Sequence, residues 1–217
     1  MICRHVDEPV AIKIIPKLEH CREHNLLMAE TEIKVLQELS GKPHITQLHF
    51  TTHTKNNISI VIQLAMKGSL AELIKHHGKL PETTALRYLQ QTIHGYRALA
   101  QHHYLHRDIK PNNLVLTTQD QLLIADFGLC TKTHSQDPPS FSRVGSPLYM
   151  APEIVDDSAT QQNSLCYSHS SDIWAIGLTF LEMLLGRPAM KAQKERELIE
   201  EVLAFDVDKV LPGGLSK

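Results

Sequence analysis

The chain has 217 residues, of which 42% are hydrophobic and 21% are charged, and its formal net charge at pH 7 is −2. This composition is typical of a globular protein that buries its own core, so it excludes a disordered or fibrous chain and a small scaffold stapled by disulfides or metals. Because neither sign of charge is in excess, composition gives no reason to expect a nucleic-acid or anionic-lipid partner.

The first third of the chain contains two β-branched runs that predict strands, at residues 10–15 and 58–64. Between them, apolar residues recur at near-helical spacing over residues 26–39 and predict one long helix. We therefore expect a strand-rich beginning followed by a helical remainder.

The remaining two thirds are dominated by helical spacing. Residues 70–74 predict a short helix, and residues 86–99 predict a longer one that begins near Pro81. An apolar run at residues 173–185 predicts a helix buried in the core. This run is too short to span a bilayer and contains Glu182, so we expect no membrane partner.

Between these helices, residues 114–116 and 122–125 flank a polar turn and predict a small hairpin. The polar stretch at residues 131–147 shows no periodicity and is predicted to be a loop, and a second polar insert, residues 156–171, precedes the buried helix. Loops of this length inside a domain more often serve function than structure.

The compartment is indicated by the cysteines and by the first residues of the chain. No apolar run follows Met1, so no signal peptide is expected. We expect reduced thiols and a cytoplasmic location, with the nucleus as an alternative. No C-x-x-C pair, which would indicate a zinc or redox site, occurs among the four cysteines, Cys3, Cys21, Cys130 and Cys166.

Four short motifs occur in a set order: V-A-I-K at residues 10–13, H-R-D-x-x-x-x-N at 106–113, D-F-G at 126–128 and A-P-E at 151–153. Any one of them could arise by chance, but the four in this order and spacing indicate a common origin. Together they resemble the signature of the eukaryotic protein kinase family. The resemblance implies an α+β, two-lobed kinase fold, with ATP and Mg²⁺ as cofactors and proteins as substrates.

By this resemblance, Lys13 holds the α and β phosphates of ATP and is oriented by a glutamate from the following helix. Glu32, 19 residues further on, matches the family better than Glu30 does. Asp126 and Asn113 supply hard oxygen ligands that suit Mg²⁺. Taken singly, each of these residues would be read as a surface or turn residue, and only their combination favours a site.

The same resemblance gives catalytic roles to the H-R-D segment. Asp108 accepts the proton of the substrate hydroxyl, and Asn113 closes the motif. Lys110, two residues after Asp108, is the pattern of serine/threonine kinases, in which this lysine steadies the transferring phosphate. The sequence thus predicts phosphoryl transfer to serine or threonine.

The adenine site is implied by position in the family pattern. Residues 63–66 correspond to the hinge between the lobes, with Gln63 and Ala65 contacting ATP. Ala11 and Val115 are expected to cover the two faces of the adenine. These positions also suit an ordinary core, and the two interpretations are compatible.

A regulatory role is implied for Arg107, which directly precedes the catalytic aspartate. Kinases with an arginine here are often switched on by phosphorylation of the loop before A-P-E, because a phosphate adds about −1.5 to −2 charge that the arginine can pair. Ser142 is the predicted acceptor from its position before Gly145. An unmodified loop serine is the competing interpretation.

Two features depart from the family pattern. No G-x-G-x-x-G precedes Lys13, since the first glycine is Gly41, and Arg196 is the last arginine and falls too early to pair with Glu153. We therefore expect a single kinase domain over residues 1–217 that is shortened at both ends. In it, residues 1–64 form a partial β-rich N-lobe, and residues 65–217 form the hinge and an incomplete helical C-lobe.

Two functions remain open at this point. The first is an ATP-dependent protein serine/threonine kinase, favoured by the intact lysine, aspartates and asparagine. The second is a catalytically weak or inactive kinase-like module that binds partners, favoured by the missing glycine-rich loop. We expect Glu153 to be a buried carboxylate without a partner, which would destabilise the fold. The oligomeric state is not indicated by the sequence.

Overall fold

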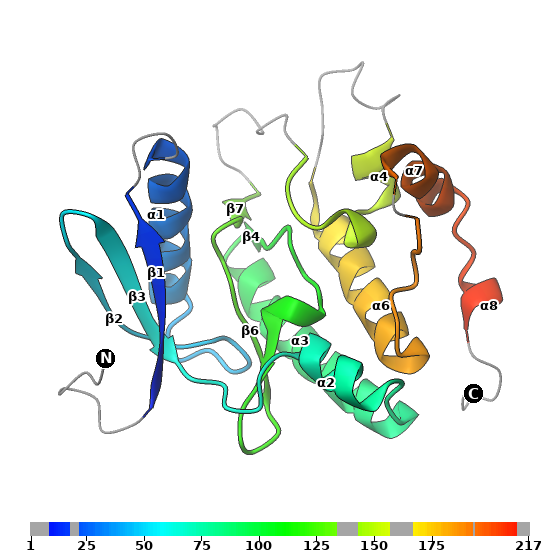
Figure 1. The fold of residues 1–217 in the computed structure, drawn as a ribbon, viewed down its shortest axis with the longest axis horizontal. Coiled ribbons are helices and arrows are strands. Elements are labelled where there is room, and N and C mark those ends of the chain that lie inside the picture. Colours follow the sequence, from blue (N-terminus) through cyan, green and yellow to red (C-terminus); the bar gives the residue numbers. More distant parts are fainter. Residues whose placement is uncertain (1–8, 18–21, 134–142, 157–166, 193, 212–217) are drawn as a thin grey trace.

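The computed structural model describes residues 9–17, 22–133, 143–156, 167–192 and 194–211. Its first part is an antiparallel sheet of three strands in the order β1–β3–β2, built from Val10–Pro16, Asn57–Gln63 and Leu48–His53. The helix α1 (Arg22–Glu38) packs against β1 and β2 (Figure 1). The predicted strands and long helix are confirmed, whereas β2 was not predicted.

The faces of β1 explain how this sheet presents its side chains. Lys13 pairs with Ile60 in the antiparallel register of β1 and β3. Ile12 and Ile14 are exposed, whereas Ala11 and Lys13 are half-buried. Because side chains alternate between the two faces of a strand, Ala11 and Lys13 share one face. Among the described residues β1 is an edge strand.

The rest of the molecule is mainly helical and is built on α3 (Glu82–Gln101) and α6 (His169–Leu185), which pack against each other (Figure 1). The short helix α2 (Leu70–His77) begins with a capping box between Ser69 and Glu72. The other α-helices within the described ranges are short: α4 (Pro152–Val155), α7 (Glu195–Leu203) and α8 (Val207–Val210). The structure thus combines helices with small antiparallel sheets, which confirms the predicted α+β class.

Two small sheets lie beside α3. The predicted hairpin is present as β5 (Leu114–Leu116) and β6 (Leu122–Ile124), and the 3₁₀ turn η2 (Pro111–Asn113) leads into it. The second sheet pairs β4 (Tyr104–Leu105) with β7 (Thr131–Lys132). Since β7 lies at the start of the predicted loop 131–147, that loop begins with a paired segment.

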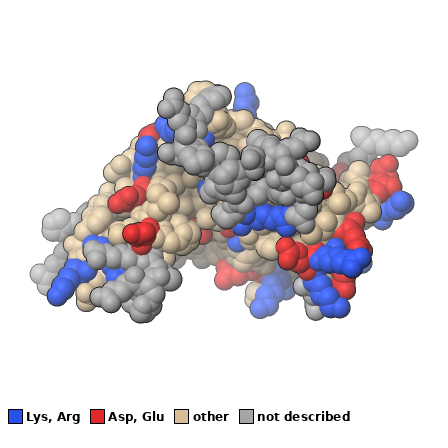
Figure 2. Space-filling model, turned by 90° about the horizontal axis from the view of Figure 1, so that it is seen from above, with Lys and Arg blue, Asp and Glu red and all other residues tan. Residues whose placement is uncertain are grey.

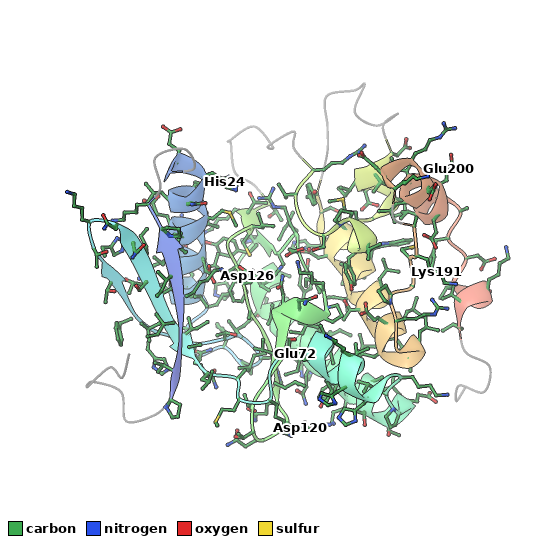
Figure 3. All side chains as sticks on the ribbon, viewed as in Figure 1. His24, Glu72, Asp120, Asp126, Lys191 and Glu200 are labelled. Atoms are coloured by element: carbon green, nitrogen blue, oxygen red, sulfur yellow. The ribbon has the colours of Figure 1, made fainter. Side chains whose placement is uncertain are left out.

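Polar contacts secure the turn of the β5–β6 hairpin. Asp120 in this turn accepts hydrogen bonds from Lys67 Nζ at 3.0 Å and from Tyr88 OH at 2.9 Å, and it also pairs with Arg87. Although partial burial alone would raise the pKa of Asp120, these donors lower it to about 2. Figure 3 shows Asp120 at the opposite end of the hairpin from Asp126.

Two expectations about residues 153–171 are corrected. The last of these residues belong to α6, which begins at His169 with Ser168 as N-cap, because serine side chains there satisfy the free N–H groups of the first turn. Residues 157–166 lie outside the described part. Glu153 is exposed rather than buried, and its Oε1 accepts a hydrogen bond from Ser171 Oγ at 2.9 Å. The expected destabilisation from a buried lone carboxylate is therefore wrong.

The surface carries both signs of charge. On the face seen in Figure 2, basic and acidic side chains are interspersed and do not form one large patch. No helix within the described ranges is long and apolar enough to cross a membrane. Neither observation points to a particular partner.

Candidate active site

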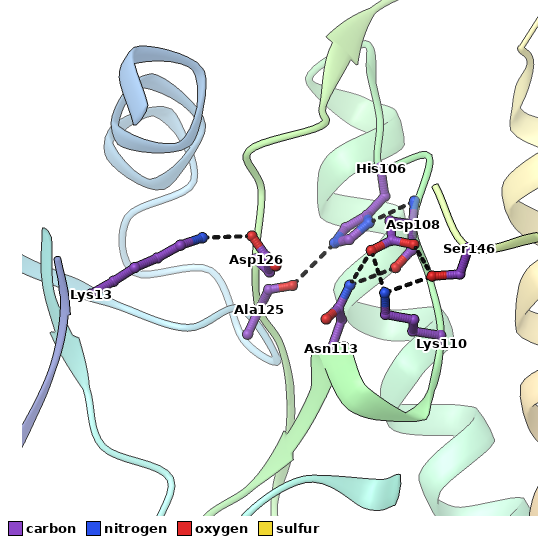
Figure 4. A network of polar contacts seen from close by, with 8 residues as sticks. All are labelled: Lys13, His106, Asp108, Lys110, Asn113, Ala125, Asp126 and Ser146. Carbon is purple, nitrogen blue, oxygen red and sulfur yellow. Dashed lines mark hydrogen bonds and ion pairs between the residues drawn. The ribbon is translucent and has the colours of Figure 1, made fainter. Parts of the chain in front are cut away.

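The polar side chains of the first motif and of D-F-G meet at Lys13. Lys13 Nζ lies 2.7 Å from Glu32 Oε2 of α1. It also lies 2.7 Å from Asp126 Oδ1, which follows β6 (Figure 4). Glu32 is buried, whereas Glu30 on the same helix is exposed. Of the two glutamates, it is thus Glu32 that the structure brings to Lys13.

The charges of this triad are set by competing effects. Burial alone would lower the pKa of Lys13, but the carboxylates of Glu32 and Asp126 outweigh it and the pKa is raised. Burial raises the pKa of Glu32, and Lys13 offsets only part of that rise. Burial likewise favours the neutral form of Asp126, yet the Lys13 ammonium lowers its pKa overall. Lys13 stays cationic at neutral pH, and with its side chain 36% exposed it can also meet an anion from solvent.

A second polar network surrounds Asp108. Lys110 Nζ and Asn113 Nδ2 each donate to Asp108 Oδ2 at 2.8 Å. Ser146 Oγ donates to Asp108 Oδ1 at 2.8 Å and accepts from Lys110 Nζ at 2.6 Å (Figure 4). The Asp108 carboxylate is therefore held between a cation, an amide and a hydroxyl, with only 9% of its side chain exposed.

The backbone beside Asp108 is held by α6. Asp172 in the first turn of α6 is 2% exposed and accepts from His106 N at 2.7 Å, Arg107 N at 2.9 Å and Tyr96 OH at 3.0 Å. Arg107 has a φ of +65°, a left-handed conformation that a non-glycine residue adopts at a cost of about 1 to 3 kcal/mol. We infer that the Asp172 carboxylate stabilises this conformation.

The H-R-D and D-F-G segments are joined through His106. Its ring is edge-on to the Phe127 ring, with centroids 5.4 Å apart, and both residues are fully buried. Asp108 N donates to His106 Nδ1, so His106 Nε2 carries the proton and donates to Ala125 O at 3.2 Å. This contact connects the residue before Asp126 with the segment that carries Asp108.

Asn113 and Asp126 lie at one end of the β5–β6 hairpin. Ala125 N donates to Asn113 O at 2.9 Å, which extends the ladder beyond Leu114 and Ile124. Asn113 donates both of its hydrogen bonds to Asp108 from Nδ2, so its Oδ1, on the opposite side of the side-chain amide, takes no part in them. No group of three His, Cys, Asp or Glu within the described ranges could hold a metal. One carboxylate and one amide oxygen fit Mg²⁺, which commonly completes its shell with water and substrate phosphates.

The four predicted adenine contacts are all half-buried. Ala11 pairs with Ile62 in the sheet, while Val115 lies in β5. A cavity of about 460 Å³ beside the 63–66 segment is lined by Gln63 but by neither Ala11 nor Val115. The adenine roles of these residues, Ala65 included, therefore stay predictions.

Several residues of the site were missed in the sequence. Ser146 stands in the G-S-P segment before A-P-E, and its hydroxyl type and position were the available signal. Tyr96 offered none, because its partner Asp172 is 76 residues away.

The two predicted regulatory residues are only partly described. Arg107 donates from Nε to Leu129 O at 2.7 Å. Ser142, the predicted phosphorylation site, lies outside the described residues.

Known proteins resemble this chain over most of its length. The protein kinase domain family matches residues 1–210. The chain is 34% identical over 184 residues to CBL-interacting serine/threonine-protein kinase 7 of Arabidopsis thaliana, covering 83% of this chain and 41% of that protein. It is 30% identical over 211 residues to protein kinase C epsilon type of Oryctolagus cuniculus, covering 97% and 27%.

A third relative is serine/threonine-protein kinase ATG1a of Arabidopsis thaliana, 32% identical over 204 residues, covering 89% of this chain and 30% of the relative. The chain thus spans between about a quarter and two fifths of the length of these curated relatives. The family match extends over nearly all 217 residues, and the motif residues meet in linked polar networks. The chain therefore belongs to the protein kinase domain family.

Proposed function

We propose that this chain supplies the catalytic site of a protein serine/threonine kinase, which transfers the terminal phosphoryl group of ATP to a serine or threonine hydroxyl of a protein. The observation that carries the proposal is the Asp108 carboxylate, held by Lys110, Asn113 and a hydroxyl, and linked through His106 to the segment of Asp126. The names of the relatives support the hydroxyl class.

Asp108 is proposed to accept the proton of the substrate hydroxyl. A bond forms between that oxygen and the γ-phosphorus, the bond from the γ-phosphorus to the bridging oxygen breaks, and ADP leaves. The contact between Ser146 Oγ and Asp108 Oδ1 supports this role, because it places one hydroxyl within proton-transfer distance of the carboxylate. Lys110, 2.8 Å from Asp108, is a cation suited to the charge on the transferring phosphoryl group.

Lys13 is proposed to hold the α and β phosphates while Glu32 keeps its ammonium in place. Asn113 and Asp126 would hold Mg²⁺. The bound ion would neutralise charge on the phosphates as the bond to the leaving oxygen breaks. Adenine contacts are proposed as a set for the residues that the family pattern predicts: Gln63, Ala65, Ala11 and Val115.

The wider organisation is likewise proposed from the family. Residues 1–64 would form the smaller lobe and residues 65–217 the hinge and larger lobe, with the nucleotide between them. Arg107 would pair with a phosphate on Ser142. A cytoplasmic location, or a nuclear one, is supported by the thiol of Cys130, which is buried and unpaired.

The experiment is phosphate transfer from Mg-ATP to serine- and threonine-containing peptides by the full chain. Asp108→Asn should lower kcat at least about 100-fold by removing the proton acceptor, and Asp126→Asn should do the same by removing a ligand of Mg²⁺. Asp208→Asn, at an exposed aspartate of α8, is the matched control, and its kcat should stay within twofold of that of the parent. Transfer that is undetectable in the parent, or equal in all four proteins, would contradict the proposal.

A further inference from the structure

Tyr167 makes contacts that the proposed function does not use. It directly precedes Ser168, the N-cap of α6, so a capped and largely buried helix fixes its position. Tyr167 OH accepts from Val144 N at 2.8 Å and donates to Val144 O at 2.7 Å. A phenol has one proton and two lone pairs, so both bonds form together. One hydroxyl thus satisfies both main-chain polar groups of Val144.

The ring of Tyr167 contacts the H-R-D segment. Arg107 Cζ lies 5.4 Å from the ring centroid, which is within the range of a cation–π interaction. Arg107 is also held through its main-chain N–H by Asp172 and through Nε by Leu129 O. Tyr167 therefore touches the residue that directly precedes Asp108.

The two residues after Val144 lie against the same backbone. Gly145 has a φ of +99°, and a Cβ at this position would overlap Arg107 O, so the two main chains approach closely. Ser146 follows, with Oγ 2.8 Å from Asp108 Oδ1. Because the chain between Val144 and Ser146 is one residue long, the position of Val144 limits where the Ser146 hydroxyl can be.

We propose that Tyr167 is a positioning residue, whose hydroxyl anchors residues 143–146 and whose ring supports Arg107, so that Ser146 stays on the Asp108 carboxylate. The anchoring of residues 143–146 by Tyr167 is inferred from the contacts alone, and only its effect on catalysis rests on the proposed function. It uses the first turn of α6 as a common support, because Asp172 in that turn holds the backbone of the H-R-D segment.

The first test is hydrogen exchange of the Val144 amide, measured by NMR on the full chain. Tyr167→Phe keeps the ring beside Arg107 and removes both hydrogen bonds. A cavity of about 20 Å³ lined by Val144, Ser146 and Tyr167 has room for one water, so the freed Val144 groups can be hydrated and the variant should fold. The Val144 amide should exchange at least about tenfold faster, equivalent to about 1.4 kcal/mol.

The matched control is Tyr88→Phe, which removes a tyrosine hydroxyl bonded to Asp120 in the β5–β6 turn. It should leave exchange of the Val144 amide within twofold of the parent. Trypsin gives a second reading, because cleavage after Arg143 should be faster in Tyr167→Phe and unchanged in the control. Equal Val144 exchange in parent and Tyr167→Phe, or equal acceleration by both variants, overturns the anchor.

Kinetics test the consequence for catalysis. In Tyr167→Phe, kcat/KM for the peptide should fall about tenfold while KM for ATP stays within twofold, because Lys13 and Asp126 do not contact Tyr167. Faster Val144 exchange with unchanged peptide kinetics overturns the positioning role. If the parent transfers no phosphate at all, the proposed function fails, and Val144 exchange alone decides the anchor.

Discussion

Replacing Asp172 by asparagine tests how the H-R-D segment is held. The change keeps the size of the side chain but removes its charge and replaces one acceptor oxygen by an NH₂ group. Three donors now converge on the carboxylate: His106 N at 2.7 Å, Arg107 N at 2.9 Å and Tyr96 OH at 3.0 Å. With a single oxygen left, at least one buried main-chain N–H must face an NH₂ donor.

The magnitude follows from these contacts. A hydrogen bond to a charged group contributes about 1.5 to 3 kcal/mol, and leaving a buried donor unsatisfied costs about 1 to 3 kcal/mol. Asp172 is 2% exposed, so water cannot readily replace the lost acceptor. We therefore expect Asp172→Asn to lower the free energy of unfolding by about 3 kcal/mol. For a chain of this size, that corresponds to a fall in Tm of about 6 to 12 °C.

The assay is thermal and urea unfolding of the parent, of Asp172→Asn and of Tyr96→Phe. Tyr96→Phe removes one donor and leaves the carboxylate with its two main-chain bonds, so it should cost only about 1 kcal/mol. Activity gives a second measure. Because a misplacement of 1 Å at a catalytic group can cost about 100-fold in rate, kcat should fall strongly in Asp172→Asn. Equal stability of the two variants would refute the view that the carboxylate organises this segment.

Further outcomes follow from single contacts. Glu32→Gln breaks the ion pair to Lys13 and should lower kcat/KM for ATP at least about tenfold, whereas Glu30→Gln, at an exposed position of the same helix, should change it less than twofold. The pKa of Asp120, about 2 against an ordinary 3.8, lies lower in the folded state, so its ionised form stabilises the fold above about pH 4 and this contribution is lost as pH falls towards 2. Between about pH 4 and pH 2, urea unfolding should show the free energy of unfolding falling by about 1 kcal/mol more for the parent than for Asp120→Asn. This value is reduced for solvent screening. Ser142→Ala should abolish activation by loop phosphorylation, and mass spectrometry that finds the activating phosphate on another residue would contradict the assignment.

Much of the fold could be predicted from local pattern. β-Branched residues predict β1, helical spacing predicts α3, and the apolar run before Gly186 predicts α6. These elements can be predicted because the spacing of apolar residues within one segment depends on the secondary structure of that segment. The strand β2, Leu48–His53, was missed, since two histidines and two threonines weaken its apolar pattern. Its pairing with β3 gives it stability that its own composition does not indicate.

The resemblance of the four motifs to the kinase signature predicted Lys13, Asp108, Asn113 and Asp126 as a set, because each motif is a short segment that can be recognised directly in the sequence. What only the tertiary structure decided is which of their side chains touch one another. Lys13 meets Asp126 across 113 residues of sequence. Contacts of this kind depend on how strands and helices pack, and packing brings together residues whose separation along the chain carries no periodicity.

The hydrogen bonds that support the site also join residues far apart in the sequence. Nothing in the sequence pairs Tyr96 with Asp172, Ser146 with Asp108 or Tyr167 with Val144, although these bonds hold the catalytic segment and the loop before A-P-E in place. Each of these pairs joins two separate elements or loops. A hydrogen bond between them depends on how the core packs α3 against α6 and β6, and so it is a property of the folded chain and not of any segment of it.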